Sequence, residues 1–527
     1  MLHPFRRLAY RAQRMVRWGL ARLDAWFNAV YTWRYNPLYH SGALVVLSFL
    51  VLLITGLYLL FFYRIGAPHA SVARVTDQVW AGRWIRTLHR YASDLAVAAT
   101  VIHALRMFAQ GRSWGPRVLA WVSGAVLLFV LFLCGWTGYV MIWDEQARLL
   151  AEEGARLMDI LPLFAQPISR AFSGDAAIPP AFFFLNLFAH IAVPVGLALL
   201  LWVHVSRLAR TYLLPPRPLL WGTVGLLTAL SIVWPVGMEE EAHLLRIPGN
   251  VVLDLFYSFW LPVSRGLPVG VVWIAFLAVS GVLLLVPVLQ RPTPERAPAP
   301  SVVVERLCTG CEQCYHDCPY EAITMVRRSD GREGYVARVD PAKCVSCGIC
   351  VASCAPMGVG PPGRTGRDEL KAVKEFIERV APTAEDVVLV ACDRGPARGG
   401  DFMGAPVFNV ACTGSLHTSV IEYLVRAGAG GVMVASCPPR DCWNREGVLW
   451  LQERVNHGRE AELKPRVDRR RVRLAYAAEG EPLTLLAALQ EFRDDIRKLD
   501  RGEAEEEIVI DTECETPEVS VAEEVGT

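Results

Sequence analysis

Six stretches of this 527-residue chain are apolar and long enough to cross a lipid bilayer as helices. Over the whole chain 53% of the residues are hydrophobic, which is too apolar for an ordinary soluble protein. We therefore expect an all-α transmembrane bundle of six spans, because a helix satisfies its own backbone hydrogen bonds in lipid. The predicted spans are residues 42–63, 88–109, 118–143, 182–209, 219–237 and 268–289.

The loops between these spans differ in charge, and the difference predicts their orientation. Arginines such as Arg11, Arg112 and Arg217 precede the first span or join the second to the third and the fourth to the fifth. The opposite loops are acidic and include Asp144 and Glu240. Because positively charged loops stay in the cytoplasm, we expect a multi-pass protein of the cell membrane with a cytoplasmic N-terminus. An even number of spans returns the chain to the cytoplasm, and no cleavage site for a signal peptide follows the basic N-terminus.

Two histidine pairs within the spans share one spacing: His89 and His103, then His190 and His204. Fourteen residues are close to four helical turns, so each pair lies on one helix face, about 21 Å apart along the axis. Ionisable side chains inside a membrane are costly and usually functional. Two such helices packed side by side would hold two hemes, one above the other. The alternative is ordinary histidines in apolar helices, and the identical spacing of two pairs argues against it.

Glycines in the first and third spans repeat the same spacing. Gly42 and Gly56 are fourteen residues apart, and so are Gly124 and Gly138. A missing side chain at each heme level lets a flat macrocycle approach the backbone. Close helix packing is the alternative use of glycine in membranes, but a register shared by four helices favours hemes.

Two arginines flank the histidines. Arg86 lies one turn before His89, and Arg106 lies one turn after His103. These positions point outward from the heme stack, where heme propionates need cationic partners. The alternative for each arginine is an interfacial side chain that snorkels to the membrane surface, and the sequence favours neither.

Residues 30–215 resemble cytochrome b of the quinol-oxidising respiratory and photosynthetic complexes. The resemblance implies two b hemes, quinone sites at both faces of the membrane and the option of a homodimer through this part of the chain. It also implies that His89 and His190 ligate the outer heme, and that His103 and His204 ligate the cytoplasmic one. The residues that carry it are both histidine pairs, the four glycines, Arg86, Pro194 four residues after His190, Asn36-Pro37, Thr55-Gly56 and Gly138-Tyr139-Val140.

The chain departs from that family after the fifth span, where the Pro-Glu-Trp-Tyr motif of the outer quinol site is absent. The nearest segment runs from Leu253 to Trp260 and contains Asp254. Either Asp254 or Glu241 could accept a quinol proton, and an interfacial aromatic belt with an incidental acid is the alternative. An outer quinone site is therefore in question.

Twelve of the fourteen cysteines fall between Cys308 and Cys442 in patterned groups, which favours metal ligation over disulfides. Residues 301–362 hold two Cys-x2-Cys-x2-Cys-x3-Cys runs and resemble bacterial two-cluster ferredoxins, in which the fourth cysteine of each run ligates the other [4Fe-4S] cluster. A zinc site, the alternative, rarely shows two full copies, so we expect a small α+β ferredoxin domain. Its expected ligands are Cys308, Cys311, Cys314 and Cys354 for one cluster and Cys344, Cys347, Cys350 and Cys318 for the other.

Three strand-like runs in residues 363–500 each end in a cysteine. A helix-like stretch, Ser419 to Ala427, separates the second run from the third, so we expect an α/β domain with a parallel sheet. Parallel strands would carry their cysteines at the carboxyl edge, where four thiolates suit one [2Fe-2S] cluster; chance buried cysteines are the alternative. We expect no flavin or nicotinamide site, because no glycine-rich loop follows a strand and opens a helix. The four candidate ligands are Cys392, Cys412, Cys437 and Cys442.

This last region resembles the delta (iron–sulfur) subunit of methyl-viologen-reducing hydrogenase. That family begins with a Cys-x-x-Cys pair, and the second position here is Gly395. The resemblance implies a soluble partner, either a hydrogenase or a heterodisulfide-reductase-like flavoprotein. The matching residues are Cys392, Cys412-Thr413-Gly414 and Cys437-Pro438-Pro439-Arg440-Asp441-Cys442.

Together these features predict a membrane-bound subunit that carries electrons between the quinone pool, two b hemes and cytoplasmic iron–sulfur clusters. Quinone reduction or oxidation is then the only catalysis expected. The alternative is a membrane anchor that docks a soluble oxidoreductase, with hemes not essential to turnover. A net charge of +1 gives no nucleic-acid footprint. The predicted domains are 1–215 (di-heme), 216–290 (two further spans), 291–300 (linker), 301–362 (ferredoxin), 363–500 ([2Fe-2S]) and 501–527 (acidic disordered tail).

Overall fold

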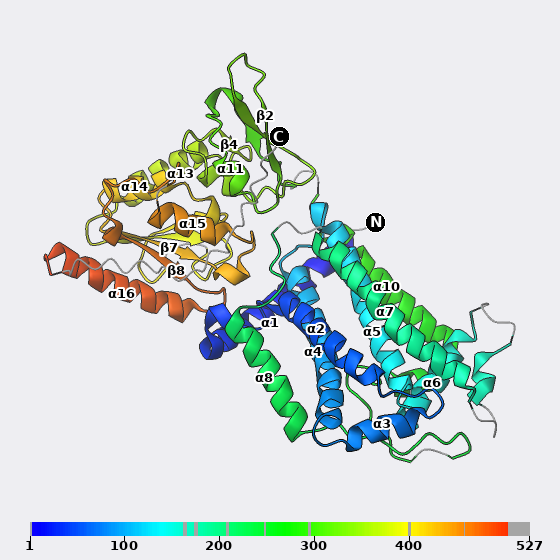
Figure 1. Cartoon of the computed structure of the whole chain (residues 1–527). Coiled ribbons are helices and arrows are strands. Elements are labelled where there is room, and N and C mark those ends of the chain that lie inside the picture. The colour runs from blue at the N-terminus through cyan, green and yellow to red at the C-terminus, as the bar shows by residue number, and fades with distance from the viewer. Residues whose placement is uncertain are drawn as a thin grey trace, which may run out of the picture. The chain divides into compact units, whose positions relative to one another are not determined.

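The computed structural model describes residues 3–161, 166–172, 178–206, 210–246, 249–293, 297–398, 402–457 and 459–503 (Figure 1). Most of the predicted acidic tail, residues 504–527, and residues 294–296 of the predicted linker lie outside the described residues. The chain divides into two compact units. One combines Met1–Arg17 with Tyr35–Arg291, and the other combines Trp18–Arg34 with Pro292–Thr527. Helix α1 (His3–Tyr35) therefore contributes to both, and its backbone leaves helical geometry at Thr32.

The first unit is helical. Its helices are rich in leucine, valine and alanine, and in lipid only a helix gives such segments a full set of backbone hydrogen bonds. The long helices are α2 (Ser41–Leu60), α4 (Gly82–Ala109), α5 (Val118–Val140), α7 (Pro180–Ser206) and α10 (Val269–Gln290). The shorter ones are α3 (Pro68–Asp77), α6 (Glu145–Met158), α8 (Arg217–Val233) and α9 (Leu261–Arg265), with 3-10 turns at Gly115–Arg117 and Ile168–Phe172.

Five helices among the described residues are long and apolar enough to cross a membrane: α2, α4, α5 with its preceding turn, α7 and α10. The protein is thus a multi-pass membrane protein, and its long helices expose large apolar side chains such as Ile54, Val195 and Leu277. The expectation of six long spans is not confirmed. The predicted span 219–237 is helix α8, which has 17 residues and ends at Val233. It stops there because Pro235 disfavours helical backbone at the residue before it.

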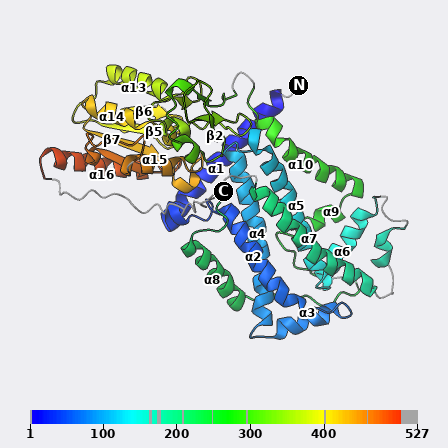
Figure 2. The same ribbon diagram turned by 45° about the horizontal axis from the view of Figure 1, so that its top comes forward.

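The long helices associate in two pairs that hold the histidines. Helix α2 packs along α4, and α5 packs along α7 (Figures 1 and 2). Both histidine pairs are on the second helix of a pair, and both glycine pairs are on the first. The bundle therefore places the two helices that carry glycines fourteen residues apart beside the two helices that carry histidines with the same spacing.

The second unit begins with a small cysteine-rich segment. Strand β1 (Val302–Val303) pairs with β4 (Val359–Gly360), and β2 (Ile323–Arg327) pairs antiparallel with β3 (Tyr335–Val339). Two single-turn helices, α11 (Gln313–His316) and α12 (Ile349–Ala352), lie within the two cysteine runs and carry Cys314 and Cys350. The buried parts of this segment are largely cysteines and small aliphatic residues.

A four-stranded sheet in the order β6-β5-β7-β8 follows in the second unit, and all its pairings are parallel. The strands alternate their side chains: Val388 and Val390 face a core with α13, α14 and α15, whereas Val387 and Leu389 face α16. The predicted parallel sheet and its helix after the second strand are confirmed. The elements are α13 (Gly366–Val380), β5 (Val387–Cys392), β6 (Val407–Val410), α14 (Thr418–Arg426), β7 (Gly431–Ser436), α15 (Gly447–Asn456), β8 (Val472–Tyr476) and α16 (Pro482–Asp500).

Candidate functional site

Each of the four paired histidines lies against a glycine of the neighbouring helix. A Cβ atom added to Gly138 would lie 2.8 Å from Cε1 of His190, closer than real contacts of this kind allow. The sequence argument placed a macrocycle against each glycine, and in the structure the edge of an imidazole ring takes that space. The other three pairs have the same arrangement, with the added Cβ at 3.0 Å for Gly42 and His103, 3.2 Å for Gly56 and His89, and 3.4 Å for Gly124 and His204.

A hydroxyl side chain directly precedes each of the four glycines, a pattern that the sequence reasoning missed. Three of the hydroxyls lie within hydrogen-bonding distance of a histidine Nδ1 atom. A hydrogen bond at Nδ1 fixes the orientation of the ring and leaves Nε2 to bind a metal. The signal was present in the sequence as Ser41-Gly42, Thr55-Gly56, Ser123-Gly124 and Thr137-Gly138. The Oγ–Nδ1 distances are 2.9 Å for Thr55 and His89, 3.1 Å for Thr137 and His190, and 2.8 Å for Ser123 and His204.

His89 of α4 and His190 of α7 face each other across the bundle. Their ring centroids are 6.3 Å apart and their planes are inclined at 63°. Two bonds between a metal and imidazole nitrogens need about 2 Å each, so one metal atom fits between the rings. The donor set, two neutral nitrogens in an apolar bundle, fits a heme iron.

The two candidate propionate ligands differ in their surroundings. Arg86 donates hydrogen bonds to the carbonyl oxygens of Val236 (2.9 Å) and Gly237 (3.2 Å). Arg106 is buried, and its guanidinium carbon lies 4.7 Å from the centroid of the Tyr39 ring. Both side chains therefore already have protein partners.

The two candidate proton acceptors also differ. Glu241 is exposed and pairs through its backbone with Asp144. Asp254 is mostly buried and forms an ion pair with Arg90 of α4, which also pairs with Asp94. The sequence reasoning missed Arg90 and Asp94, although two opposite charges four residues apart in an apolar span are a functional signal.

Two tyrosines complete this charged cluster. The Arg90 guanidinium carbon lies 4.9 Å from the ring centroid of Tyr139 and 5.7 Å from that of Tyr257. The Tyr257 hydroxyl is 2.5 Å from Oγ of Ser93. We call the cluster of Arg90, Asp94, Tyr139, Asp254 and Tyr257 the Arg90 cluster.

Within the second unit, the cysteines of the two ferredoxin-like runs lie in two groups. Burial and the neighbouring Cys308, Cys311 and Cys354 raise the pKa of the Cys314 thiol, so the fourth cysteine of the second run lies beside the first run. All four line one cavity, together with Thr309 and Met325. In the other group, burial raises the pKa values of the Cys347 and Cys350 thiols, and the nearby Cys318 raises both further. Cys350 also acts on Cys347, and Cys344 also acts on Cys350.

The remaining four cysteines gather at the carboxyl edge of the parallel sheet. Cys392 ends β5, Cys412 follows β6, and Cys437 follows β7, and each of these side chains is at least 96% buried, as is Cys442. Cys412 contacts Cys392 and Cys442, and Cys437 contacts the same two. Among the described residues, no three His, Cys, Asp or Glu side chains meet the geometry for a single metal ion.

Comparison with known proteins identifies the membrane unit. The Cytochrome b/b6/petB family matches residues 29–212. The menaquinol:cytochrome c reductase cytochrome b subunit of Bacillus subtilis is 30% identical over 176 residues, which are 31% of this chain and 79% of that protein. The chain belongs to the cytochrome b family. The corresponding subunit of Geobacillus thermodenitrificans is 29% identical over 186 residues (33% of this chain, 83% of that protein), and cytochrome b6 of Heliobacterium mobile is 31% identical over 145 residues (27% and 68%).

The residues after the membrane unit of this cytochrome b chain match two further families. A 4Fe-4S dicluster domain matches residues 307–358, and the methyl-viologen-reducing hydrogenase delta subunit matches residues 404–500. The three predicted resemblances are thereby confirmed within one chain. A solved structure titled hyperthermophilic respiratory Complex III is similar to 49% of this chain and 78% of its own, with a TM-score of 0.39 and 18% identity.

Proposed function

We propose that this protein is a membrane-bound electron-transfer subunit that links the quinone pool to iron–sulfur clusters and a soluble oxidoreductase. One observation carries the proposal: four hydroxyl–glycine pairs on α2 and α5 face four histidines on α4 and α7, in a chain that continues into a dicluster domain. The bundle is built to orient imidazoles in pairs, and the same polypeptide supplies the thiolates that would exchange electrons with them.

Heme b would be held by His89 with His190 and by His103 with His204. A bound heme takes up and releases one electron at its iron. Hydroxyl groups hold three of the four imidazole rings at Nδ1. The apolar helices would keep water from the iron, and Arg86 and Arg106 would bind the propionates beside their present protein partners. Helix α7 places its two histidines on one face although Pro194 lies between them.

Two [4Fe-4S] clusters would be held by the crossed sets Cys308, Cys311, Cys314 with Cys354 and Cys344, Cys347, Cys350 with Cys318. The grouping of these thiols supports the crossed assignment. The third set, Cys392, Cys412, Cys437 and Cys442, would hold a [2Fe-2S] cluster, since four thiolates at one sheet edge are the donors that such a cluster needs. Each cluster, when bound, carries one electron at a time.

Asp254 is the better candidate for proton exchange with a quinol at the outer face, because the Arg90 cluster surrounds it with groups that hold and pass a proton. The quinol would be menaquinol, the substrate named for two of the relatives. Replacing Asp254 with asparagine should slow quinol oxidation, whereas replacing Glu241 with glutamine should leave it unchanged.

We place the N-terminus and the iron–sulfur domains in the cytoplasm, which requires α8 to cross the membrane as a short sixth span. Contacts within the first unit support this. Tyr10 donates a hydrogen bond to the Gln290 carbonyl, and Gln290 donates one to Phe108 at the end of α4. The start of α1 and the end of α10 thus share one end of the bundle. At the far end of α8, the Trp234 carbonyl accepts a hydrogen bond from Tyr91 in the first half of α4, and the Val236 carbonyl accepts one from Arg86.

The soluble partner is inferred from the last domain. Because residues 404–500 match a hydrogenase delta subunit, we infer a hydrogenase or a heterodisulfide-reductase-like flavoprotein as partner.

Spectroscopy of the purified full-length protein tests the proposal. Dithionite should produce the absorption of reduced b heme together with the EPR signals of reduced iron–sulfur clusters. Replacing His103 with leucine should halve the heme content and leave the cluster signals unchanged. A wild-type protein that binds no heme would contradict the proposal.

A further inference from the structure

One arginine is enclosed where the ferredoxin-like segment meets the parallel-sheet domain inside the second unit. The side chain of Arg454, on α15, is only 1% exposed. Its Nη2 atom donates to the Gly414 carbonyl at 2.7 Å, and its Nη1 atom lies 3.3 Å from both Oδ2 of Asp317 and Oγ of Ser353. A buried guanidinium needs a matching charge, and Asp317, also 1% exposed, supplies it. Burial lowers the pKa of Arg454 to about 10, so the side chain stays cationic at neutral pH.

The three partners of Arg454 each neighbour a cysteine from a different ligand set. Asp317 directly precedes Cys318 of the second ferredoxin set, and Ser353 directly precedes Cys354 of the first. Gly414 comes two residues after Cys412 of the third set. The Arg454 guanidinium therefore bonds to three residues, and each of them lies within two positions of a cysteine that would ligate a different cluster.

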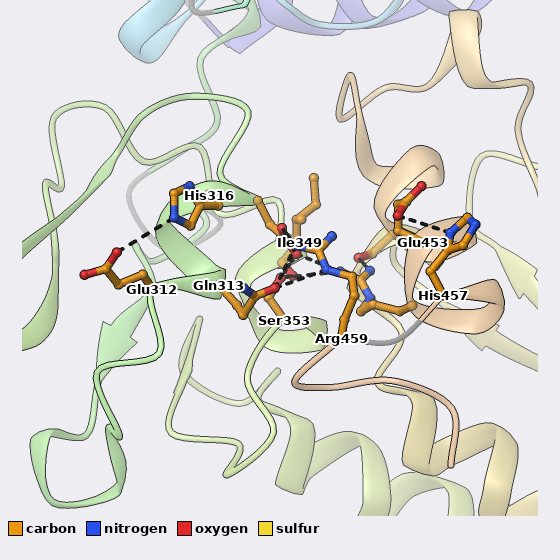
Figure 3. Close-up of polar contacts among 11 residues, drawn as sticks. Glu312, Gln313, His316, Ile349, Ser353, Glu453, His457 and Arg459 are labelled. Carbon is orange, nitrogen blue, oxygen red and sulfur yellow. Dashed lines mark hydrogen bonds and ion pairs between the residues drawn. The ribbon is translucent and has the colours of Figure 1, made fainter. Parts of the chain in front are cut away.

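A second arginine holds Asp317 from the outer side of the junction. Nη2 of Arg459 donates to Oδ1 of Asp317 and to Oε1 of Gln313, each at 2.7 Å. Figure 3 shows Gln313 of α11 directed toward Arg459 across the junction. Ser353 donates to Oδ2 of Asp317 at 2.6 Å, so both carboxylate oxygens have fixed donors.

The second and third ligand sets adjoin directly beside this junction. Ile349 is fully buried, and its Cδ1 atom lies 3.3 Å from the position of a Cβ on Gly447. The Sγ atom of Cys412 lies 3.5 Å from the same position. The absence of a side chain at Gly447 lets the two sets approach.

We propose that Arg454 is a positioning residue for electron transfer, which fixes the three cluster-binding sets relative to one another and raises their reduction potentials. This inference rests on the proposed function, which supplies the clusters. An electron that passes from one cluster to the next adds one negative charge to the acceptor and removes one from the donor, and no other bond changes. A buried cation stabilises the added charge, and Asp317 acts with the opposite sign.

Redox titration followed by EPR, on the purified full-length protein with its iron content measured, tests this inference. R454M removes the positive charge and should lower the potentials of the neighbouring clusters, whereas D317N removes the negative charge and should raise them. R454K keeps the positive charge, so its cluster potentials should equal those of the wild-type protein. A single ammonium cannot reach all three acceptors, however, so the magnetic interaction between the clusters should weaken.

The control is R471M. Arg471 also bonds a backbone carbonyl and an aspartate, Gly430 at 2.8 Å and Asp500 at 2.5 Å, but at the opposite edge of the sheet from the cysteines. Its replacement should leave all potentials unchanged. If R454M loses iron, the other two variants still test the inference. The cluster potentials should rise in D317N and should stay at the wild-type values in R454K.

Potentials that stay unchanged in R454M and D317N, or that move in the same direction in both, would overturn the role of Arg454. That outcome leaves the wild-type heme and cluster signals intact. Failure of the proposed function would instead show as a wild-type protein without those signals, so the two failures are distinguishable.

Discussion

Each hydroxyl–glycine pair of the membrane unit consists of two consecutive residues on one helix, and both residues act on a histidine of the neighbouring helix. The glycine leaves room for the imidazole ring, and the hydroxyl before it holds Nδ1 in three of the four cases. His190 has an additional acceptor, the Cys134 carbonyl at 3.0 Å from its Nδ1 atom. Outer partners of this kind typically change metal affinity by about 10–100-fold when removed.

A valine at position 138 should therefore remove one heme. Its Cβ would overlap Cε1 of His190 at 2.8 Å, and the ring cannot retreat without breaking its hydrogen bond to Thr137. We expect the G138V protein to retain one of two hemes, measured as heme per protein by alkaline pyridine spectroscopy. Gly196 of α7 is a matched control, because an added Cβ there meets no heavy atom within 4 Å. Two hemes in G138V would contradict the proposed ligand pair.

Residues that lie close in sequence were predictable, and residues that meet only through the fold were not. The histidine, glycine and cysteine spacings are local signals, because a helical register or a cysteine run positions them without further information. The ion pair of Arg90 with Asp254 joins residues 164 apart, and that of Arg454 with Asp317 joins residues 137 apart. Neither pairing follows from local sequence, although the charged residues of α4 were visible as an anomaly in an apolar span.

At the scale of elements, strands that carry a cysteine at their end were easier to predict than the others. Strands β5 and β7 are largely apolar and end at or directly before a cysteine, and β6 ends two residues before one. Strand β8 (Val472–Tyr476) instead lies at the edge of the sheet and carries Arg473. Helix α8 was predicted too long because the apolar composition continues past Val233, while Pro235 ends the helix. Composition alone does not show where a helix stops.

Helix α8 decides which side of the membrane the later elements occupy. Its 17 residues span about 25 Å, at the short end of what a bilayer accepts. In intact cells, a membrane-impermeant maleimide should label E240C, in the loop that follows α8, and should not label R217C, at its start. Both variants should react after the cells are permeabilised. Unmutated protein in intact cells is the control, because it shows how much maleimide reacts with the native cysteines. Labelling of R217C in intact cells, or protection of E240C, would contradict a crossing by α8.

At the scale of the whole molecule, each unit has an internal order that suits electron transfer. In the first unit, two histidine levels lie on the same pair of helices, α4 and α7. In the second, the ferredoxin-like segment adjoins the third cysteine set at Ile349 and Gly447. The two units are joined covalently through α1 and the segment after α10, so one polypeptide holds every proposed centre. Such a chain can conduct electrons between quinone and the clusters, which we call a wire, or it can serve mainly to anchor a soluble enzyme to the membrane.

A kinetic experiment on the intact protein distinguishes a wire from an anchor. Menaquinol is mixed with oxidised protein in detergent, and heme absorption and cluster EPR are followed in time, with the reverse reaction started from reduced clusters and menaquinone. If electrons pass through the hemes, replacing His103 with leucine should slow cluster reduction or reoxidation at least about tenfold, because it removes a centre between quinone and clusters. Replacing His69 with leucine is the matched control. The His69 ring, on α3, lies 3.2 Å from the Glu239 carbonyl and belongs to neither histidine pair, so its loss should leave the rate unchanged. An unchanged rate in the His103 variant would show that the membrane unit serves as an anchor.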